Sequence, residues 1–261
     1  MFDFHMHSKV SFDSEAAPER MVQAALNAGL KEICFTDHVD HPAPGEPATM
    51  IFDLADYHRA YDHLTAEGMK IRRGCEIGLK QDNAELVRRD SQRRQFDFVI
   101  GSIHFVDNLD IYEEPYWRGR TVEQAYQQFL ETTLQCVRIH EDYDVLGHLT
   151  YISKTLANPT HERIPYETRR EITDEILKEL VKKGKGLEIN SSGVDRCGAF
   201  LPDEAYFRRF RELGGEIVTF GSDAHSPERV GQYAGRAMEI LKDTFGYVCT
   251  YENRKPIFHK L

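Results

Sequence analysis

The sequence lacks the features that mark membrane, secreted or disulfide-stapled proteins. Its longest apolar runs, such as residues 96–103, are short and interrupted, far below the roughly 20 residues that a membrane span needs. Its five cysteines are scattered, with no Cys-x-x-Cys pair, which is typical of reduced thiols in a cytoplasmic protein. The first residues also lack the basic and apolar regions of a signal peptide.

Positive charge is also scarce. Lysine and arginine total 33 against 43 aspartate and glutamate residues, which gives a formal net charge of −10. Because such a chain repels a phosphate backbone, we expect neither a nucleic-acid polymer nor a membrane as partner. A small local positive site is still allowed, and the oligomeric state is not indicated.

What the sequence does contain is a regular alternation of short strand-like runs and longer amphipathic segments. The 261 residues, 41% of them hydrophobic, suffice for a substantial core. Helical patterns cover 18–27, 121–140, 165–183 and 227–243, and loops are expected at 41–49 and 106–120. The expected strands are 2–6, 32–36, 70–77, 96–103, 144–148, 186–190 and 216–220.

This alternation is typical of a parallel sheet with helical crossovers. No linker, repeat or low-complexity stretch divides the chain. We therefore expect an α/β fold in which residues 1–261 form a single domain, a closed or nearly closed barrel of seven strand–helix units.

Histidine is the informative residue type, with twelve in the chain. It is the commonest metal ligand in proteins. Polar side chains stand at the end of each expected strand, which is where parallel barrels carry their active sites. The metal-binding types among them are His5, His7, His38, Glu76, His104, His148, Asp223 and His225.

Each of these residues alone is a weak signal, because a single histidine after a strand is usually a hydrogen-bonded structural residue. Their joint recurrence at equivalent points is far more specific. Burying so many polar groups costs several kcal/mol unless they are compensated, and metal ions compensate them well. The pattern predicts a metal cluster, and its mixed imidazole and carboxylate ligands suit Zn, Fe or Mn.

The ordered motifs resemble those of the PHP (polymerase and histidinol phosphatase) superfamily over nearly the whole chain. They are His5-Met-His7, Thr36-Asp-His38, Glu76, Gly-Ser-Ile-His104, Gly-His148 and Gly-Ser-Asp-Ala-His225. Segments 98–104 and 187–193 are similar to the histidinol-phosphatase branch. The resemblance implies a distorted (β/α)7 barrel with the metal site at the C-terminal ends of its strands.

The resemblance further implies two to three divalent transition-metal ions. The ligands would be His5, His7, Glu76 and Asp223 for the first ion, Glu76, His104 and His148 for the second, and His38, His225 and a loop residue for the third. That loop position holds Asp13, where several family members have histidine. Asp13 either ligates the third ion, leaves that site weaker, or caps the helix that starts near Pro18.

The implied activity is metal-dependent hydrolysis of a phosphate monoester, L-histidinol phosphate of histidine biosynthesis. Closely spaced cations, bridged by the two oxygens of Glu76, acidify a shared water to a hydroxide that attacks phosphorus. Asp223 or His225 would then shuttle the proton. The alternatives are a related phosphoesterase for other small phosphates or nucleotides, and a non-catalytic metal-binding module.

A phosphate monoester also needs cationic partners from the protein. The planar fork of arginine matches phosphate, and Arg196, just past the sixth strand, is similar to the phosphate-contacting arginine of the branch. Arg163, after the fifth strand, is the second candidate. Either arginine is otherwise an ordinary solvated surface residue.

Overall fold

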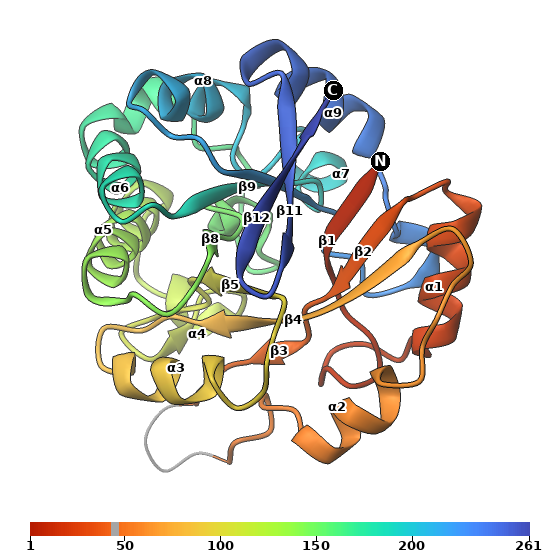
Figure 1. Ribbon diagram of the computed structural model, residues 1–261. Helices are drawn as coiled ribbons and strands as arrows, with labels where there is room; N and C mark the ends of the chain where they lie inside the picture. The colour runs from red at the N-terminus through yellow and green to blue at the C-terminus, as the bar shows by residue number, and fades with distance from the viewer. Residues whose placement is uncertain (43–46) are drawn as a thin grey trace.

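Parallel strands form a nearly closed barrel at the centre of the molecule (Figure 1). The computed structural model describes residues 1–42 and 47–261, so residues 43–46 of the expected loop 41–49 lie outside the described residues. Seven strands of the described part follow the order β1-β2-β4-β5-β8-β9-β10, and short β3 (His38–Val39) pairs with β4. Their bounds are β1 Phe2–Met6, β2 Glu32–Phe35, β4 Lys70–Gly78, β5 Phe98–Ser102, β8 Val145–Leu146, β9 Gly186–Asn190 and β10 Val218–Gly221.

The first and last barrel strands meet at their C-terminal ends. The backbone N–H of His7 donates to the carbonyl of Ala224 at 2.9 Å, and that of Asp223 donates to the carbonyl of His5 at 2.8 Å. These bonds join the residues that follow β10 to the end of β1. The predicted seven-unit barrel is therefore confirmed.

Helices pack around the outside of the barrel (Figure 1). Helix α1 shows why, since Pro18 suits its first turn, it buries Met21, Val22 and Ala25, and Gly29 follows with a left-handed φ of +68°. The longer helices are α1 Pro18–Asn27, α2 Leu54–Tyr61, α3 Ala84–Ser91, α5 Val122–Ile139, α6 Arg170–Lys182, α8 Glu204–Glu212 and α9 Ala234–Thr244. Shorter turns are α4 Glu114–Trp117, α7 Val194–Cys197, η1 Tyr151–Lys154, η2 Tyr166–Arg169 and η3 Pro227–Arg229.

A C-terminal hairpin covers the opposite end of the barrel, where the strands begin. Strands β11 (Tyr247–Glu252) and β12 (Lys255–Lys260) pair antiparallel and cross that end in Figure 1. Tyr251 is buried in a cluster with Phe4 and Phe98, and its ring centroid lies 4.7 Å from that of Phe98. The hairpin therefore closes the end of the barrel away from the predicted ligands.

Three expectations about the elements were wrong, and one of them is the helix 227–243, which the structure divides into η3 and α9. Segment 106–120 is not a plain loop but contains most of the hairpin of β6 (Phe105–Val106) and β7 (Leu109–Asp110), followed by α4. Its two turn residues, Asp107 and Asn108, have φ of 52° and 60°, as a tight hairpin turn requires. The expected strand 144–148 shortens to β8, although the backbone N–H of Gly147 still donates to the carbonyl of Gly101 on β5 at 3.0 Å. Within the described residues, no helix is both long enough and apolar enough to cross a membrane.

Candidate metal centre

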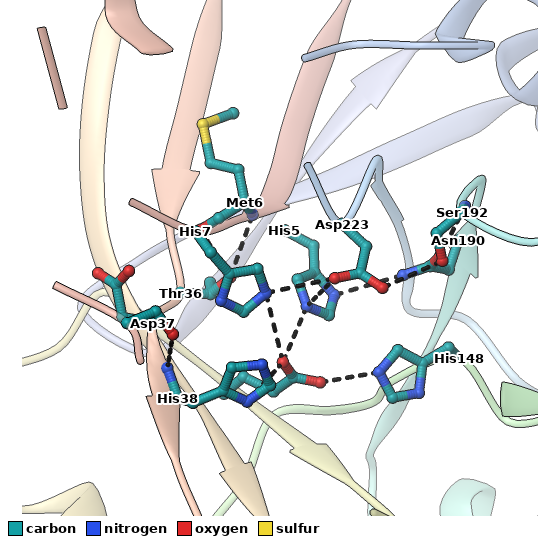
Figure 2. A network of polar contacts seen from close by, with 12 residues as sticks. His5, Met6, His7, Thr36, Asp37, His38, His148, Asn190, Ser192 and Asp223 are labelled. Atoms are coloured by element: carbon teal, nitrogen blue, oxygen red, sulfur yellow. Dashed lines mark hydrogen bonds and ion pairs between the residues drawn. The ribbon is translucent and has the colours of Figure 1, made fainter. Parts of the chain in front are cut away.

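The predicted ligands gather at the C-terminal end of the barrel, on the strands or directly after them. Figure 2 shows His5, His7, His38, His148 and Asp223 among them. The barrel strands run parallel, so their C-terminal ends share one rim. The residues are His5 on β1, His7 just after it, His38 on β3, Glu76 on β4, His104 after β5, His148 after β8, and Asp223 and His225 after β10.

Glu76 lies at the centre of this cluster and is almost completely buried. Its Oε2 atom lies 3.1 Å from Nε2 of His5 and 3.5 Å from Nε2 of His7. Its Oε1 atom lies 2.8 Å from Nε2 of His148 and 3.3 Å from Nε2 of His104. Oε2 also lies 3.4 Å from Nδ1 of His38, so the two oxygens of one carboxylate face different sets of histidines, which is the arrangement a bridging ligand requires.

Asp223 lies beside His5 and His7, which are also expected ligands of the first ion, and it contacts a lysine. Its Oδ1 atom lies 3.3 Å from Nε2 of His7 and 3.6 Å from Nε2 of His5. Its Oδ2 atom accepts a hydrogen bond from Nζ of Lys154 at 2.6 Å. The backbone of Asp223 has a left-handed φ of 56°, which is unusual for a residue other than glycine and is often found at functional sites.

The structure places Asp13 with the two residues expected at the third site. Its Oδ2 atom lies 2.8 Å from Nε2 of His225 and 3.3 Å from Nε2 of His38. The N-cap of α1 is Ala17 with no side-chain cap, so Asp13 does not cap that helix. Its role as a metal ligand stays a prediction.

The buried polar atoms of this cluster fit divalent cations. Among the described residues, neither ring nitrogen of His7 makes a hydrogen bond, although the ring is fully buried. Burial, followed by the neighbouring His225 and His38, lowers the pKa of His7 to about 3, so its ring is neutral as a metal ligand must be.

The carboxylates of the centre are ionised. Burial opposes ionisation of Glu76, but the surrounding histidines, above all His5 and His38, hold its pKa well below the usual range. Burial likewise opposes ionisation of Asp223, yet Lys154 and His5 lower its pKa well below the usual range. The donor atoms form groups in which all lie within 4.8 Å of one another. Ionised oxygens and imidazole nitrogens at such spacing suit Zn, Fe or Mn.

Glu188 on β9 holds the first histidine in place. Its Oε1 atom lies 2.6 Å from Nδ1 of His5, which turns Nε2 of that ring towards Glu76. Its Oε2 atom accepts from the backbone N–H of His148 at 2.8 Å. Gly221 leaves the space for it, because a Cβ at that position would lie 2.2 Å from Glu188 Oε1. Glu188 lies within the expected strand 186–190, but the sequence pattern gave it no role.

Sequence reasoning missed two further residues of the site, Lys154 and Asp40. Lys154 ends η1, and its Nζ atom also donates to Oγ of Ser192 at 2.7 Å. Asp40 follows β3 and contacts two of the ligand histidines. No spacing rule distinguishes either residue from other charged loop residues, because the paths of the loops bring them to the site.

A cavity of about 450 Å³ opens over the cluster. Lys154 lies on its wall together with the carboxylates of Asp110 and Glu113. The remaining lining residues are Phe12, Asp13, His38, Asp40, Met50, His104, Phe105, Tyr112, Tyr151 and His225. The cavity therefore combines the metal-facing side chains, one cationic group, aromatic rings and further carboxylates.

The two predicted phosphate-binding arginines line a neighbouring groove instead of this cavity. Arg196 Nη1 donates to the backbone carbonyl of Lys154 at 2.8 Å and to the hydroxyl of Tyr112 at 3.3 Å. Arg163 is largely exposed and lies 3.6 Å from Asp203 Oδ2. Their role as phosphate ligands stays a prediction.

Comparisons with known proteins identify the family. The model of the PHP domain matches residues 3–192, and the chain belongs to this family. It is 31% identical to a probable histidinol-phosphatase of Clostridium acetobutylicum, over 99% of this chain and 96% of that protein. It is 32% identical to the histidinol-phosphatase of Lactococcus lactis, over 97% and 95% of the two chains.

A solved structure agrees with this assignment. The crystal structure of the Lactococcus lactis histidinol phosphate phosphatase, in complex with zinc, L-histidinol and phosphate, superposes with a TM-score of 0.87. The two chains are 30% identical, and the match covers 98% of each. The resemblance to the histidinol-phosphatase branch, first seen in the motifs, is thereby confirmed.

Proposed function

We propose that this protein is a metal-dependent phosphomonoesterase that hydrolyses L-histidinol phosphate to L-histidinol and phosphate. The main support for this proposal is the cavity, which is lined by metal-facing side chains, by Lys154 and by the carboxylates of Asp110 and Glu113. Full-length similarity to two histidinol-phosphatases supports the same substrate.

The ligand set would hold two to three divalent ions. We assign His5, His7, Glu76 and Asp223 to the first ion, Glu76, His104 and His148 to the second, and Asp13, His38 and His225 to the third. Bound there, the ions would supply a water of lowered pKa and neutralise charge on the phosphoryl oxygens.

Lys154 is the protein cation best placed for the phosphoryl group. Its ammonium is partly buried at the cavity wall, 2.6 Å from Asp223 Oδ2, so it reaches the rim of the cluster. A charge-assisted hydrogen bond from this group to a phosphoryl oxygen strengthens as negative charge develops there. Arg196 and Arg163 remain secondary candidates from the adjoining groove.

In this proposal, Asp223 or His225 takes the proton that the attacking water loses and passes it to the leaving alkoxide. Asp223 faces both the histidine ligands and Lys154, and His225 Nδ1 lies 2.9 Å from the carbonyl of Asp223. The side chain of His225 is 32% exposed, so it can exchange protons with water in the cavity.

The acidic side of the cavity matches the other end of the proposed substrate. L-Histidinol phosphate carries an ammonium group beside its imidazole ring. Asp110 is partly buried, and its Oδ1 accepts from the backbone N–H of Tyr112 at 2.8 Å, which fixes the carboxylate. Asp110 and Glu113 would attract the ammonium and disfavour nucleotides, whose additional groups are neutral or anionic.

A substrate panel tests this proposal. Metal-reconstituted protein is assayed with L-histidinol phosphate, p-nitrophenyl phosphate and a nucleoside monophosphate. A hydrogen-bonded ion pair is worth about 1.5–3 kcal/mol, so kcat/KM should favour histidinol phosphate by about tenfold to hundredfold. Preference for the nucleotide would support the related phosphoesterase, and no turnover of any ester would support a non-catalytic metal-binding module.

We also propose that residues 1–261 act as one phosphatase domain in the cytoplasm, with a small phosphorylated substrate and no nucleic-acid polymer as partner. All five cysteines fall within the described ranges and are free thiols, four of them buried. Free thiols support a reducing compartment.

A further inference from the structure

We infer that Asp40 is a positioning residue that orients two metal ligands, His38 and His104, at once. The inference rests on the proposed function only in taking these two histidines as ligands. Asp40 is 2% exposed and directly follows β3, where its backbone N–H donates to the carbonyl of Met50 at 2.9 Å. The carboxylate is therefore held inside the site rather than at its surface.

One carboxylate contacts the same ring atom of both histidines. Asp40 Oδ1 and Oδ2 lie 3.0 and 3.1 Å from Nδ1 of His104. Oδ2 also lies 2.9 Å from Nδ1 of His38, an ion-pair contact without hydrogen-bond geometry, and this Nδ1 atom lies farther, 3.4 Å, from Glu76 Oε2. Each ring thus presents its Nδ1 edge to Asp40.

The Nε2 atoms, on the other side of each ring, face other expected ligands of the second and third ions. Nε2 of His104 lies 3.3 Å from Glu76 Oε1, at the second group, and Nε2 of His38 lies 3.3 Å from Asp13 Oδ2, at the third. An imidazole that binds a metal through Nε2 keeps its proton on Nδ1. A carboxylate facing Nδ1 favours this tautomer, fixes the ring and makes Nε2 a stronger donor. Asp40 therefore holds one expected ligand of the second ion and one expected ligand of the third ion.

Gly78 on β4 makes room for this carboxylate. A Cβ at position 78 would lie 1.8 Å from Asp40 Oδ1, far inside van der Waals contact. Gly78 has no left-handed φ, so the space and not the backbone conformation requires glycine. Gly78→Ala therefore displaces the carboxylate of Asp40 without changing its chemistry.

The test measures metal binding rather than catalysis. The parent, Asp40→Ala, Asp40→Asn and Gly78→Ala proteins are stripped of metal and titrated with Zn²⁺ against a competing chelator, with bound metal measured by elemental analysis. Gly235→Ala in α9, where a Cβ meets nothing within 4 Å, and Asp107→Asn in the β6–β7 turn are the matched controls.

We expect Asp40→Ala and Gly78→Ala to lower the affinity for two of the bound ions by about tenfold to hundredfold, which is the usual effect of losing a hydrogen-bonding partner of a metal ligand. Asp40→Asn should be milder, because its amide oxygen can accept from one histidine while its NH₂ group opposes the other. The controls should bind like the parent. Melting of the metal-free proteins shows that each variant folds, and Gly78→Ala carries the test if an Asp40 variant does not.

Unchanged affinity in both Asp40→Ala and Gly78→Ala would overturn the inference. Loss of one ion with no change at the other would overturn it as well, since Asp40 would then be a direct ligand of a single ion. Failure of the parent to hydrolyse phosphate esters while binding zinc would refute the proposed function and leave this result standing.

Discussion

Among single residues, Glu76 has the most demanding role, because its two oxygens face different sets of histidines. Glu76→Gln removes the charge and leaves one weakly ligating oxygen. We expect kcat to fall by more than about a thousandfold, since both water activation and charge neutralisation depend on this bridge. Retention of more than about a tenth of the activity would contradict the bridging role. Glu239→Gln, exposed on α9, is the matched control.

Lys154 and Arg196 give competing predictions for phosphate recognition. If Lys154 contacts the phosphoryl group, Lys154→Ala lowers kcat/KM by about tenfold to hundredfold, the effect of one charge-assisted bond. The sequence predicts a loss of at least about tenfold for Arg196→Ala, with partial rescue by Arg196→Lys. Steady-state kinetics of both variants, with metal content measured in parallel, ranks the two residues. Parent-like turnover in either variant removes that residue from the phosphate site.

Asp13 is the ligand whose role the sequence left most open. Because its carboxylate lies between His38 and His225, Asp13→Ala should lower occupancy of the third site alone. Elemental analysis should then read about one ion fewer per chain than in the parent. An unchanged stoichiometry would remove Asp13 from the ligand set.

The predictability of these residues differs for a physical reason. His5, Glu76 and Asp223 could be predicted because each lies at or directly after a strand of recognisable pattern, and parallel strands end at one rim. Lys154 and Asp40 could not, since their positions depend on how the following turns fold back over the rim. A charged residue in a turn looks the same in sequence whether it faces solvent or the site.

At the scale of elements, the C-terminal hairpin was the largest omission from the sequence prediction. Its turn residues, Asn253 and Arg254, both have positive φ, yet no glycine announces the turn. Strands 2–6 and 186–190 matched the structure because apolar and polar residues alternate along both of them. Strand β12 (Lys255–Lys260) gave a weaker signal, because it holds only two adjacent apolar residues, Ile257 and Phe258, beside a proline and polar residues.

The hairpin should contribute strongly to stability through Tyr251. This ring is 2% exposed and packs in the inner cluster against Phe98. Tyr251→Ala should lower the free energy of unfolding by about 3–5 kcal/mol, as large aromatic truncations in cores do. Phe258→Ala in the paired strand, where the ring is 50% exposed, should cost less than about 1 kcal/mol. If urea denaturation shows equal losses of unfolding free energy in the two variants, the hairpin does not stabilise the barrel through the buried ring of Tyr251.

For the whole molecule, the sequence predicted a single barrel because strand–helix alternation runs unbroken along the chain. The closure between β1 and β10 was expected from the number of units, but its bonds depend on the strained turn at Asp223. That turn brings the first and last ligand motifs together, so the metal centre and the closure of the barrel share the same residues.

Metal binding should therefore stabilise the whole fold. Removing the ions leaves buried carboxylates and histidines in close contact without their compensating cations. We expect chelation to lower the melting temperature by several degrees or more, and added Zn²⁺ or Mn²⁺ to restore it, because the ions bind the folded state preferentially. A melting temperature independent of metal would contradict this coupling.

The most direct test of the central claim is a metal titration of activity. Protein stripped by a chelator is titrated with Zn²⁺, Mn²⁺ or Fe²⁺. At each point of the titration, both the release of phosphate from L-histidinol phosphate and the amount of bound metal are measured. Our prediction is negligible release from the stripped protein, and activity that rises with occupancy and saturates at about two to three ions per chain. Full activity in protein that contains no metal would contradict it.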